Sequence, residues 1–303
     1  MTDSTNGLDL AEMQQYETKE LVDADRITVD ALLSAQDART PLTKLTDEQV
    51  ESFRRDGWVF VRSEQVWSAE QLYNLLHQVN VMDTWPEKAN HWMKYFEKNR
   101  NRGKTGHEDA PEKILQRIEN FLQYNPELDA LINDKRMLDF VGQLFGEDAV
   151  LYKEKINYKL PGGDGFNPHQ DVAAGWWMYG QSLHISVLIA VDGATKVNGG
   201  LELVRGAHRD GMLSPEWKEL PKDVCERLHW EMAEARPGDV VFFDSYVPHR
   251  SGPNNTDKPR RVVYTTYGKA SEGDFRARYY ADKRKSFPPD VEREQGKVYE
   301  YKI

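Results

Sequence analysis

The sequence contains a single cysteine, Cys225, among 303 residues. One thiol cannot close an internal disulfide or supply a thiolate metal cluster, so neither supports this fold. Low cysteine usage is typical of a reducing compartment, and the acidic, polar N-terminus is unlike a signal peptide. We therefore expect a cytoplasmic protein.

Long apolar runs and excess positive charge are also missing. No apolar stretch approaches the roughly 20 residues that a membrane span requires. The formal net charge is −10, whereas binding to nucleic-acid phosphates needs a basic face. We expect neither a membrane nor nucleic acid as a partner, and the oligomeric state stays open. The chain is rich in aromatic residues, with 8 Trp, 14 Tyr and 11 Phe, which indicates a well-filled core.

The chain divides by composition into a tail and one domain. Residues 1–40 are polar and weakly periodic, which predicts an N-terminal tail. Residues 41–303 are expected to form a single domain. Its parts are a helical front part (41–148), a β-rich core (149–270) and a C-terminal segment (271–303).

Local signals predict the elements of the front part. Thr46 and Gln49 form a capping box that opens a helix, and Gly57 ends it before a strand at 58–61. Apolar spacing predicts further helices at 68–80, 85–100, 112–123 and 127–146. The basic, glycine-bearing segment 98–109 reads either as a mobile flap over a site or as an ordinary solvated loop.

From about residue 149 the apolar period changes to two. Strands are predicted at 150–160, 183–192, 200–205, 240–244 and 261–267. Helices followed by strands predict an α+β fold. We expect a jelly roll, that is, a cupin-like double-stranded β-helix, flanked by N-terminal helices.

Three separated residues form a candidate metal site. The first long strand leads through a Gly/Pro-rich turn to His169 and Asp171, which can face the same side of an extended backbone. His249 follows a later strand. Two imidazoles and one carboxylate form the facial triad of Fe(II) oxygenases, which leaves coordination positions open for a co-substrate and O2. A buried hydrogen-bonded pair, a loop histidine or a catalytic zinc site are the competing interpretations.

An arginine at the start of the last predicted strand could bind a diacid. Strand alternation lets only one of Arg260 and Arg261 point inward. Its guanidinium could hold the far carboxylate of 2-oxoglutarate in a two-pronged contact, assisted by the Ser251 hydroxyl. The alternative is a surface arginine.

The combination of motifs resembles the phytanoyl-CoA dioxygenase family of Fe(II)/2-oxoglutarate oxygenases. It runs over roughly 45–270, through LTDEQVESFRRDGWVFV, KINYKLPGG…HQD, NGGLELVRGAHRDG and GDVVFFD…PHRSGPNNT…R. The resemblance implies that iron is bound by His169, Asp171 and His249. It also implies that 2-oxoglutarate is bound by Arg260, Ser251 and Asn157.

The resemblance further implies the chemistry. Such a dioxygenase uses Fe(II), 2-oxoglutarate and O2 to oxidise an unactivated C–H bond, and it releases succinate and CO2. The related halogenases carry a small residue in place of the carboxylate. Because Asp171 is present, hydroxylation or a related oxidative step is favoured.

Residues near the triplet are candidates for substrate contact. Trp176, Trp177 and Tyr179 could form an aromatic wall for an ammonium group or an apolar ligand, or could only pack the sheet. Lys153 and Lys155 share a strand face with Asn157 and could reach a substrate anion, or form a solvated row.

Two further segments could approach the site. Glu119, expected on a helix together with Arg117, is a candidate polar contact, and the basic, aromatic segment 276–290 could fold over the mouth. We expect a small polar metabolite that carries an amine, a carboxylate or a phosphonate. The alternatives are a lipid, terpenoid or acyl-CoA substrate, a non-redox cupin-like metal-binding protein, or a zinc hydrolase or isomerase.

Overall fold

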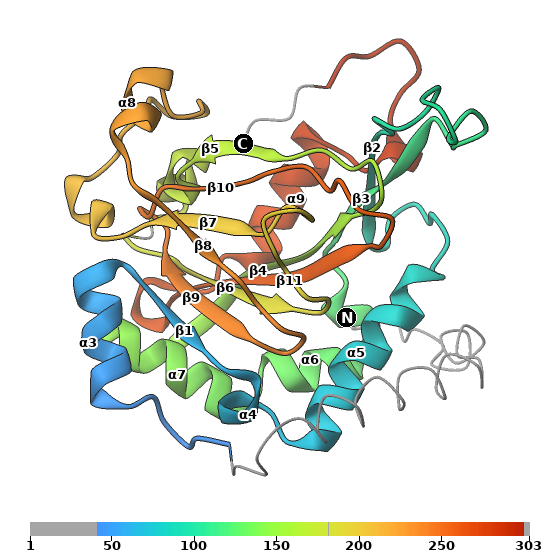
Figure 1. Cartoon of the computed structure of the whole chain (residues 1–303). Helices are drawn as coiled ribbons and strands as arrows, with labels where there is room; N and C mark the ends of the chain where they lie inside the picture. The colour runs from blue at the N-terminus through green and yellow to red at the C-terminus, as the bar shows by residue number, and fades with distance from the viewer. Residues whose placement is uncertain (1–40, 181, 300–303) are drawn as a thin grey trace.

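The computed structural model describes residues 41–180 and 182–299, so the predicted tail at 1–40 lies outside the described residues. In this part of the chain the strands form two antiparallel sheets (Figure 1). The larger sheet has the strand order β1 (Trp58–Val61), β9 (Val240–Asp244), β6 (Ile185–Ala190), β11 (Arg260–Lys269), β4 (Ala149–Lys159), β3 (Lys113–Glu119) and β2 (Met93–Lys98). The smaller sheet has the order β5 (Phe166–His169), β10 (His249–Ser251), β7 (Leu201–Val204) and β8 (Trp230–Ala233).

The α-helices lie mainly on one side of the larger sheet (Figure 1). They are α3 (Asp47–Asp56), α4 (Ser63–Val66), α5 (Ala69–Asp83), α6 (Pro126–Ile132), α7 (Lys135–Phe145), α8 (Lys222–Arg227) and α9 (Arg276–Ser286). Of these, α3, α5, α6 and α7 cover the sheet face, whereas α9 packs near β4. The predicted α+β fold, an antiparallel double sheet with flanking helices, is confirmed.

Strand β6 shows why the core has two layers. Its sequence ISVLIA is apolar apart from Ser186, and all six residues are buried. Val187 and Ile189 pack against the helices, whereas Leu188 and Ala190 pack between the two sheets. A strand buried on both faces loses the polar alternation of a half-exposed strand. The sequence signal at 183–192 is therefore a continuous apolar run.

The local signals at the start of the domain are confirmed. Thr46 caps α3, its hydroxyl accepts a hydrogen bond from the Gln49 N–H at 3.2 Å, and the Gln49 side chain accepts from the Thr46 N–H at 2.8 Å. Gly57 ends the helix at φ +82°, a left-handed conformation that favours glycine.

Two of the predicted helices are wrong. Segment 85–100 contains β2, and segment 112–123 contains β3 followed by a 3₁₀ turn. The short apolar runs in these segments fit a helix or a strand equally well. Pairing decides between them, because β3 lies beside β4 with Arg117 opposite Asn157. The front part of the domain thus contributes strands to the larger sheet.

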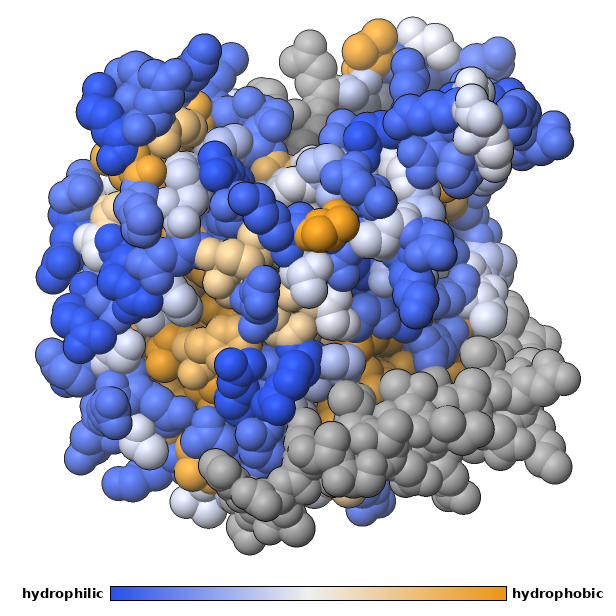
Figure 2. Space-filling view, in the orientation of Figure 1, coloured by the Kyte–Doolittle hydropathy of each residue, from blue (hydrophilic) through white to orange (hydrophobic). Residues whose placement is uncertain are grey.

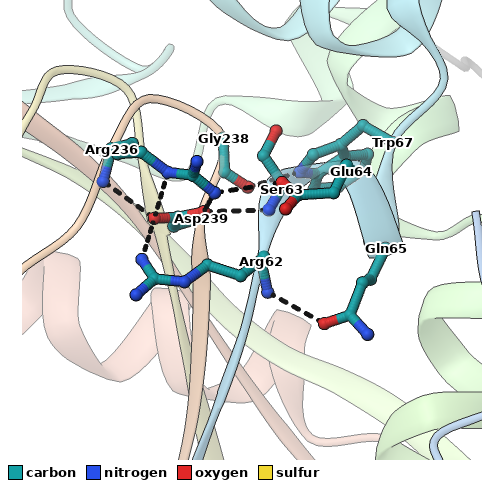
Figure 3. Close-up of polar contacts among 8 residues, drawn as sticks. All are labelled: Arg62, Ser63, Glu64, Gln65, Trp67, Arg236, Gly238 and Asp239. Carbon is teal, nitrogen blue, oxygen red and sulfur yellow. Dashed lines mark hydrogen bonds and ion pairs between the residues drawn. The ribbon is translucent and has the colours of Figure 1, made fainter. Parts of the chain in front are cut away.

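A buried aspartate joins the first strand to the turn before β9 (Figure 3). Asp239 accepts hydrogen bonds from the Ser63 N–H at 2.8 Å and from Arg62 Nη1 at 2.9 Å. It also accepts from the backbone N–H of Arg236 at 2.8 Å. Trp67 Nε1 donates to the carbonyl of Gly238 nearby at 2.8 Å. These bonds fix α4 and the edge strand β1 against the sheet.

The C-terminal helix α9 is attached to β4 through Glu154, which is buried. The Glu154 carboxylate accepts from Arg276 at 2.7 Å and from the Tyr280 hydroxyl at 3.1 Å. This contact holds the first part of segment 276–290 beside strand β4.

Segment 98–109 forms turns whose side chains are mostly exposed, and the Arg100 N–H donates to the carbonyl of Gly162. Its action as a flap stays a prediction.

The surface in Figure 2 is mainly hydrophilic, with hydrophobic residues grouped near the centre and lower left of the view. Among the described helices, none combines the length and the apolar composition that crossing a bilayer requires.

Candidate active site

The predicted triad converges at the end of the smaller sheet. His169 closes β5 and His249 opens β10, and the two residues are directly opposite in the antiparallel pair. Asp171 begins a 3₁₀ turn just after β5. Its Oδ1 atom lies 4.0 Å from His169 Nε2 and 3.8 Å from His249 Nε2. One potential ligand atom from each residue lies within 4.8 Å of the others, a spacing suited to one metal ion.

Backbone carbonyls orient both imidazoles. His169 Nδ1 lies 2.6 Å from the carbonyl oxygen of Asn167, and His249 Nδ1 lies 3.0 Å from that of Val247. A carbonyl oxygen only accepts, so each Nδ1 carries the hydrogen and each Nε2 keeps its lone pair. This is the arrangement by which metal-binding histidines are held in the correct tautomer.

The protonation states of His169, His249 and Asp171 are those that metal binding requires. Burial lowers the pKa of His169 to about 3, and burial also lowers the pKa of His249. Burial alone would raise the pKa of Asp171, but the neighbouring His249 and Lys153 lower it further than burial raises it. Ser186 Oγ donates to Asp171 Oδ2 at 2.7 Å. Near neutral pH the site thus offers two neutral imidazoles and one carboxylate, which fit Fe(II).

A small pocket of about 30 Å³ adjoins the triad. Asn157, Ser251 and Tyr264 line it together with His249. The Asn157 Oδ1 atom is buried without a hydrogen-bond partner. Asn157 and Ser251 are two of the three residues at which the resemblance places the 2-oxoglutarate contacts.

Arg260 is the inward-facing arginine of the pair. Only 2% of it is exposed, and it donates to the carbonyl of Gly199. Arg261 points to the other face, where it pairs with Asp192 at 2.9 Å and Asp83 at 2.6 Å. Alternation on β11 thus resolves the choice that the sequence left open.

A large cavity of about 1050 Å³ opens beside the triad. Trp176 and Tyr179 line it, as predicted for an aromatic wall. Trp177, by contrast, is 55% exposed and does not belong to the cavity lining. The 3₁₀ turn that carries these rings therefore presents two of the three to the cavity.

The two lysines of β4 reach the site. Lys153 and Lys155 line both the large cavity and the small pocket. Lys153 Nζ lies 3.9 Å from the ring centroid of Trp176. Burial and the nearby Lys155 lower the pKa of Lys153 well below its usual value.

Glu119 lies on strand β3, not on a helix, and it is already paired. It accepts from Arg117 Nε at 2.7 Å and from Lys283 Nζ at 2.5 Å. Burial would raise the pKa of Glu119, but these two cations lower it to about 2. Arg117 and Lys283 line the cavity, whereas Glu119 lies behind them.

Several residues of the site were not predicted individually from the sequence. They are Ser186, Lys283, Tyr264, Tyr279 and Asp282. Tyr279, Asp282 and Lys283 belong to segment 276–290, which the sequence analysis proposed as a whole because it is basic and aromatic. Nothing local marks Ser186, because its role depends on β6 lying beside the turn that carries Asp171.

Comparison with known proteins identifies the family. The model of the family Phytanoyl-CoA dioxygenase (PhyH) matches residues 53–262. A 2-aminoethylphosphonate dioxygenase of an uncultured bacterium (HF130_AEPn_1) is 36% identical over 259 residues, which cover 85% of this chain and 95% of that protein. A methylphosphonate hydroxylase of Gimesia maris is 38% identical over 246 residues, which cover 81% of this chain and 89% of that protein.

Solved structures agree on the fold. The crystal structure of EctD from S. alaskensis with 2-oxoglutarate and 5-hydroxyectoine aligns with a TM-score of 0.61 at 20% identity. The alignment covers 75% of this chain and 77% of that one. The same fold, the metal-ligand geometry and the family match agree, and the chain belongs to the phytanoyl-CoA dioxygenase family.

Proposed function

We propose that this 2-oxoglutarate-dependent non-haem iron dioxygenase oxidises a C–H bond of a small phosphonate. The single observation that carries the substrate class is the pair of lysines beside the triad, Lys153 and Lys155. A bound anion would favour the protonated form of both amines. No carboxylate of the described residues lies within ion-pair distance of either ammonium group. Two relatives with 36% and 38% identity are named for phosphonates, which supports the same class.

The charge of the cavity supports an anionic substrate. Its lining contains seven lysines and arginines against three acidic residues, in a chain whose net charge is −10. A phosphonate presents three oxygens to such donors and carries up to two negative charges. A lipid or terpenoid would give Lys153 and Lys155 no counter-charge, so the cavity favours the small polar substrate.

The roles proposed for the metal and co-substrate residues follow from their positions. His169, Asp171 and His249 would hold Fe(II), which couples the decarboxylation of 2-oxoglutarate by O2 to oxidation of the substrate. Ser186 fixes the Asp171 carboxylate. Arg260, with Ser251 and Asn157 nearby, would hold 2-oxoglutarate.

The substrate residues would then place the C–H bond. Lys153, packed on the face of Trp176, and Lys155 would bind phosphonate oxygens next to the triad. This contact would bring the carbon attached to phosphorus next to the triad, because both lysines line the cavities together with His169 and Asp171. Tyr179 and α9 would cover the outer side and limit access of water.

A succinate-release screen tests the proposal. Enzyme loaded with Fe(II) under anaerobic conditions is mixed with 2-oxoglutarate, O2 and one candidate: methylphosphonate, ethylphosphonate or 2-aminoethylphosphonate. β-Alanine, taurine and ectoine serve as matched non-phosphonate controls. We expect succinate release to rise at least about tenfold with a phosphonate, and phosphorus NMR to show a hydroxylated phosphonate.

Stimulation by a carboxylate or sulfonate alone would overturn the phosphonate class but keep the enzyme class. Zinc in protein purified without oxygen, combined with no oxygen uptake, would favour the hydrolase or isomerase alternative. The cytoplasmic location inferred from the sequence stays a prediction.

A further inference from the structure

We infer that Lys159 acts with Arg260 as a two-cation clamp for the distal carboxylate of 2-oxoglutarate. The two residues are direct cross-strand partners, with Arg260 of β11 opposite Lys159 of β4. Side chains at directly opposite positions point to the same sheet face. The exposed fractions are 1% for Lys159 and 2% for Arg260, so both side chains lie inside the fold. Burial and the adjacent Arg260 lower the pKa of Lys159 to about 6.

The two cations converge on one point. Lys159 Nζ and Arg260 Nη2 both donate to the carbonyl oxygen of Gly199, the former at 3.3 Å. Lys159 Nζ also donates to Ser251 Oγ at 2.6 Å and to the carbonyl of Gly252. Ser251 is a lining residue of the small pocket that contains His249. The ammonium therefore lies directly behind the wall of the co-substrate pocket.

The described part of the chain places no carboxylate beside this pair. Within residues 41–180 and 182–299, no carboxylate oxygen lies within ion-pair distance of either cation. Two like charges opposite each other destabilise a sheet, and a buried charge without a partner is more costly still. The Nε atom of Arg260 is also buried without a hydrogen-bond partner.

Three other cations inside the fold have carboxylate partners. Arg261 has Asp192 and Asp83, and Arg117 and Lys283 share Glu119. Among the described residues, the hydrogen-bond acceptors of the Lys159–Arg260 pair are neutral carbonyl and hydroxyl oxygens. A bound carboxylate would supply the negative charge and favour the protonated form of Lys159. Ser251, to which Lys159 donates, lines the pocket beside the metal position.

The size of the pocket adds one requirement. A volume of about 30 Å³ is too small for a five-carbon diacid, so the side chains around it must move when the ligand enters. Movement of the Lys159 side chain would be favourable, because its hydrogen bonds to neutral carbonyl oxygens would be replaced by stronger bonds to a carboxylate.

Binding to the manganese-loaded enzyme tests this role without turnover. Calorimetry compares 2-oxoglutarate with 2-oxopentanoate, which keeps the 2-oxo acid group but lacks the distal carboxylate. In Lys159→Met we expect affinity for 2-oxoglutarate to fall roughly 10- to 100-fold, as for loss of a charge-assisted hydrogen bond. Affinity for 2-oxopentanoate should change less than about threefold.

Lys94→Met is the matched control. Lys94 is also a buried lysine that donates to a carbonyl, that of Trp85, but it lies on the edge strand β2. Lys159, by contrast, donates to Ser251, which lines the small pocket. We expect it to leave the ratio of the two affinities unchanged. Thermal unfolding without ligand gives a second readout: removing a repelled charge should not lower the Tm of Lys159→Met as much as that of Lys94→Met.

Equal loss of affinity for both ligands, or no loss for either, would show that Lys159 only supports the local structure and would overturn the inference. If Lys159→Met does not fold, Lys159→Gln keeps a donor toward Ser251 and is read in the same way. The inference rests on 2-oxoglutarate as co-substrate but not on the phosphonate. A negative substrate screen with normal 2-oxoglutarate binding would therefore reject the proposed substrate alone.

Discussion

His169 and His249 face each other across the antiparallel pair of β5 and β10, with ring centroids 4.2 Å apart. Each strand is short, and the register of the pair shifts between His249 and Ser251. The hydrogen bonds from both Nδ1 atoms to carbonyls two residues earlier in the chain fix the two rings before any metal arrives. Such a preformed donor pair reduces the ordering that metal binding would otherwise require.

Changing His249 to Gln should remove metal binding. The remaining imidazole and carboxylate supply only two ligands, and the anaerobic visible band of Fe(II) with 2-oxoglutarate should disappear. His107→Gln is the matched control, since His107 begins another His-x-Asp triplet but lies in an exposed loop. A full band in His249→Gln, or its loss in His107→Gln, would refute the assignment of the triad.

Ser186 should control metal affinity although it is no ligand. Its hydroxyl holds one oxygen of Asp171, and loss of such an orienting partner typically weakens metal binding about 10- to 100-fold. Ser186→Ala should therefore raise the Kd for Fe(II) or Mn(II) in an anaerobic titration. Thr265→Val, which removes a buried hydroxyl from the neighbouring strand, should leave that Kd unchanged. Equal Kd values in all three proteins would contradict the role.

The triad could be predicted from the sequence because each member follows a strand or a punctuated turn. His169 and Asp171 come after a Gly/Pro-rich segment, and His249 comes in a Pro-His-Arg-Ser-Gly run. The choice between Arg260 and Arg261 could not be made, because alternation gives two equal registers until pairing with β4 fixes one. The distinction between helix and strand at 113–119 failed for the same reason: the long-range pairing with β4 decides it.

Contacts between residues far apart in the chain could not be predicted from the sequence either. Glu119 looked free as a substrate contact, yet Lys283 lies 164 positions later and occupies its carboxylate. Lys159 stands at an alternate position with Lys153, Lys155 and Asn157, and nothing in the sequence separates it from the other two lysines. Its burial against Arg260 appears only when β4 and β11 are paired.

Glu119 should make the stability of the protein depend on acid pH. Its pKa is lowered from 4.5 to about 2 in the folded protein, so its stabilising contribution is complete above about pH 4.5 and is lost as pH falls toward 2. Glu119→Gln leaves Arg117 and Lys283 without their shared carboxylate. Urea unfolding should show the variant to be less stable by about 3 kcal/mol at pH 7.

The difference between wild type and Glu119→Gln should shrink as pH falls from 4.5 toward 2. Glu108→Gln is the control, because Glu108 lies in an exposed loop and takes no part in this network. A difference that stays constant from about pH 7 down to about pH 2 would show that the carboxylate charge of Glu119 does not stabilise the fold.

Lys153 should set the affinity for the phosphonate. Lys153→Met keeps most of the contact with Trp176 but removes the charge next to Asp171, and the lost charge-assisted bond should raise KM for the phosphonate roughly 10- to 100-fold. KM for 2-oxoglutarate should change much less, because Arg260 lies opposite Lys159, further along β4 than Lys153. Trp177→Ala, on the exposed side of the same aromatic turn, should leave both KM values within about twofold. If KM for 2-oxoglutarate rises instead while that for the phosphonate holds, Lys153 belongs to the co-substrate and the phosphonate lies elsewhere in the cavity.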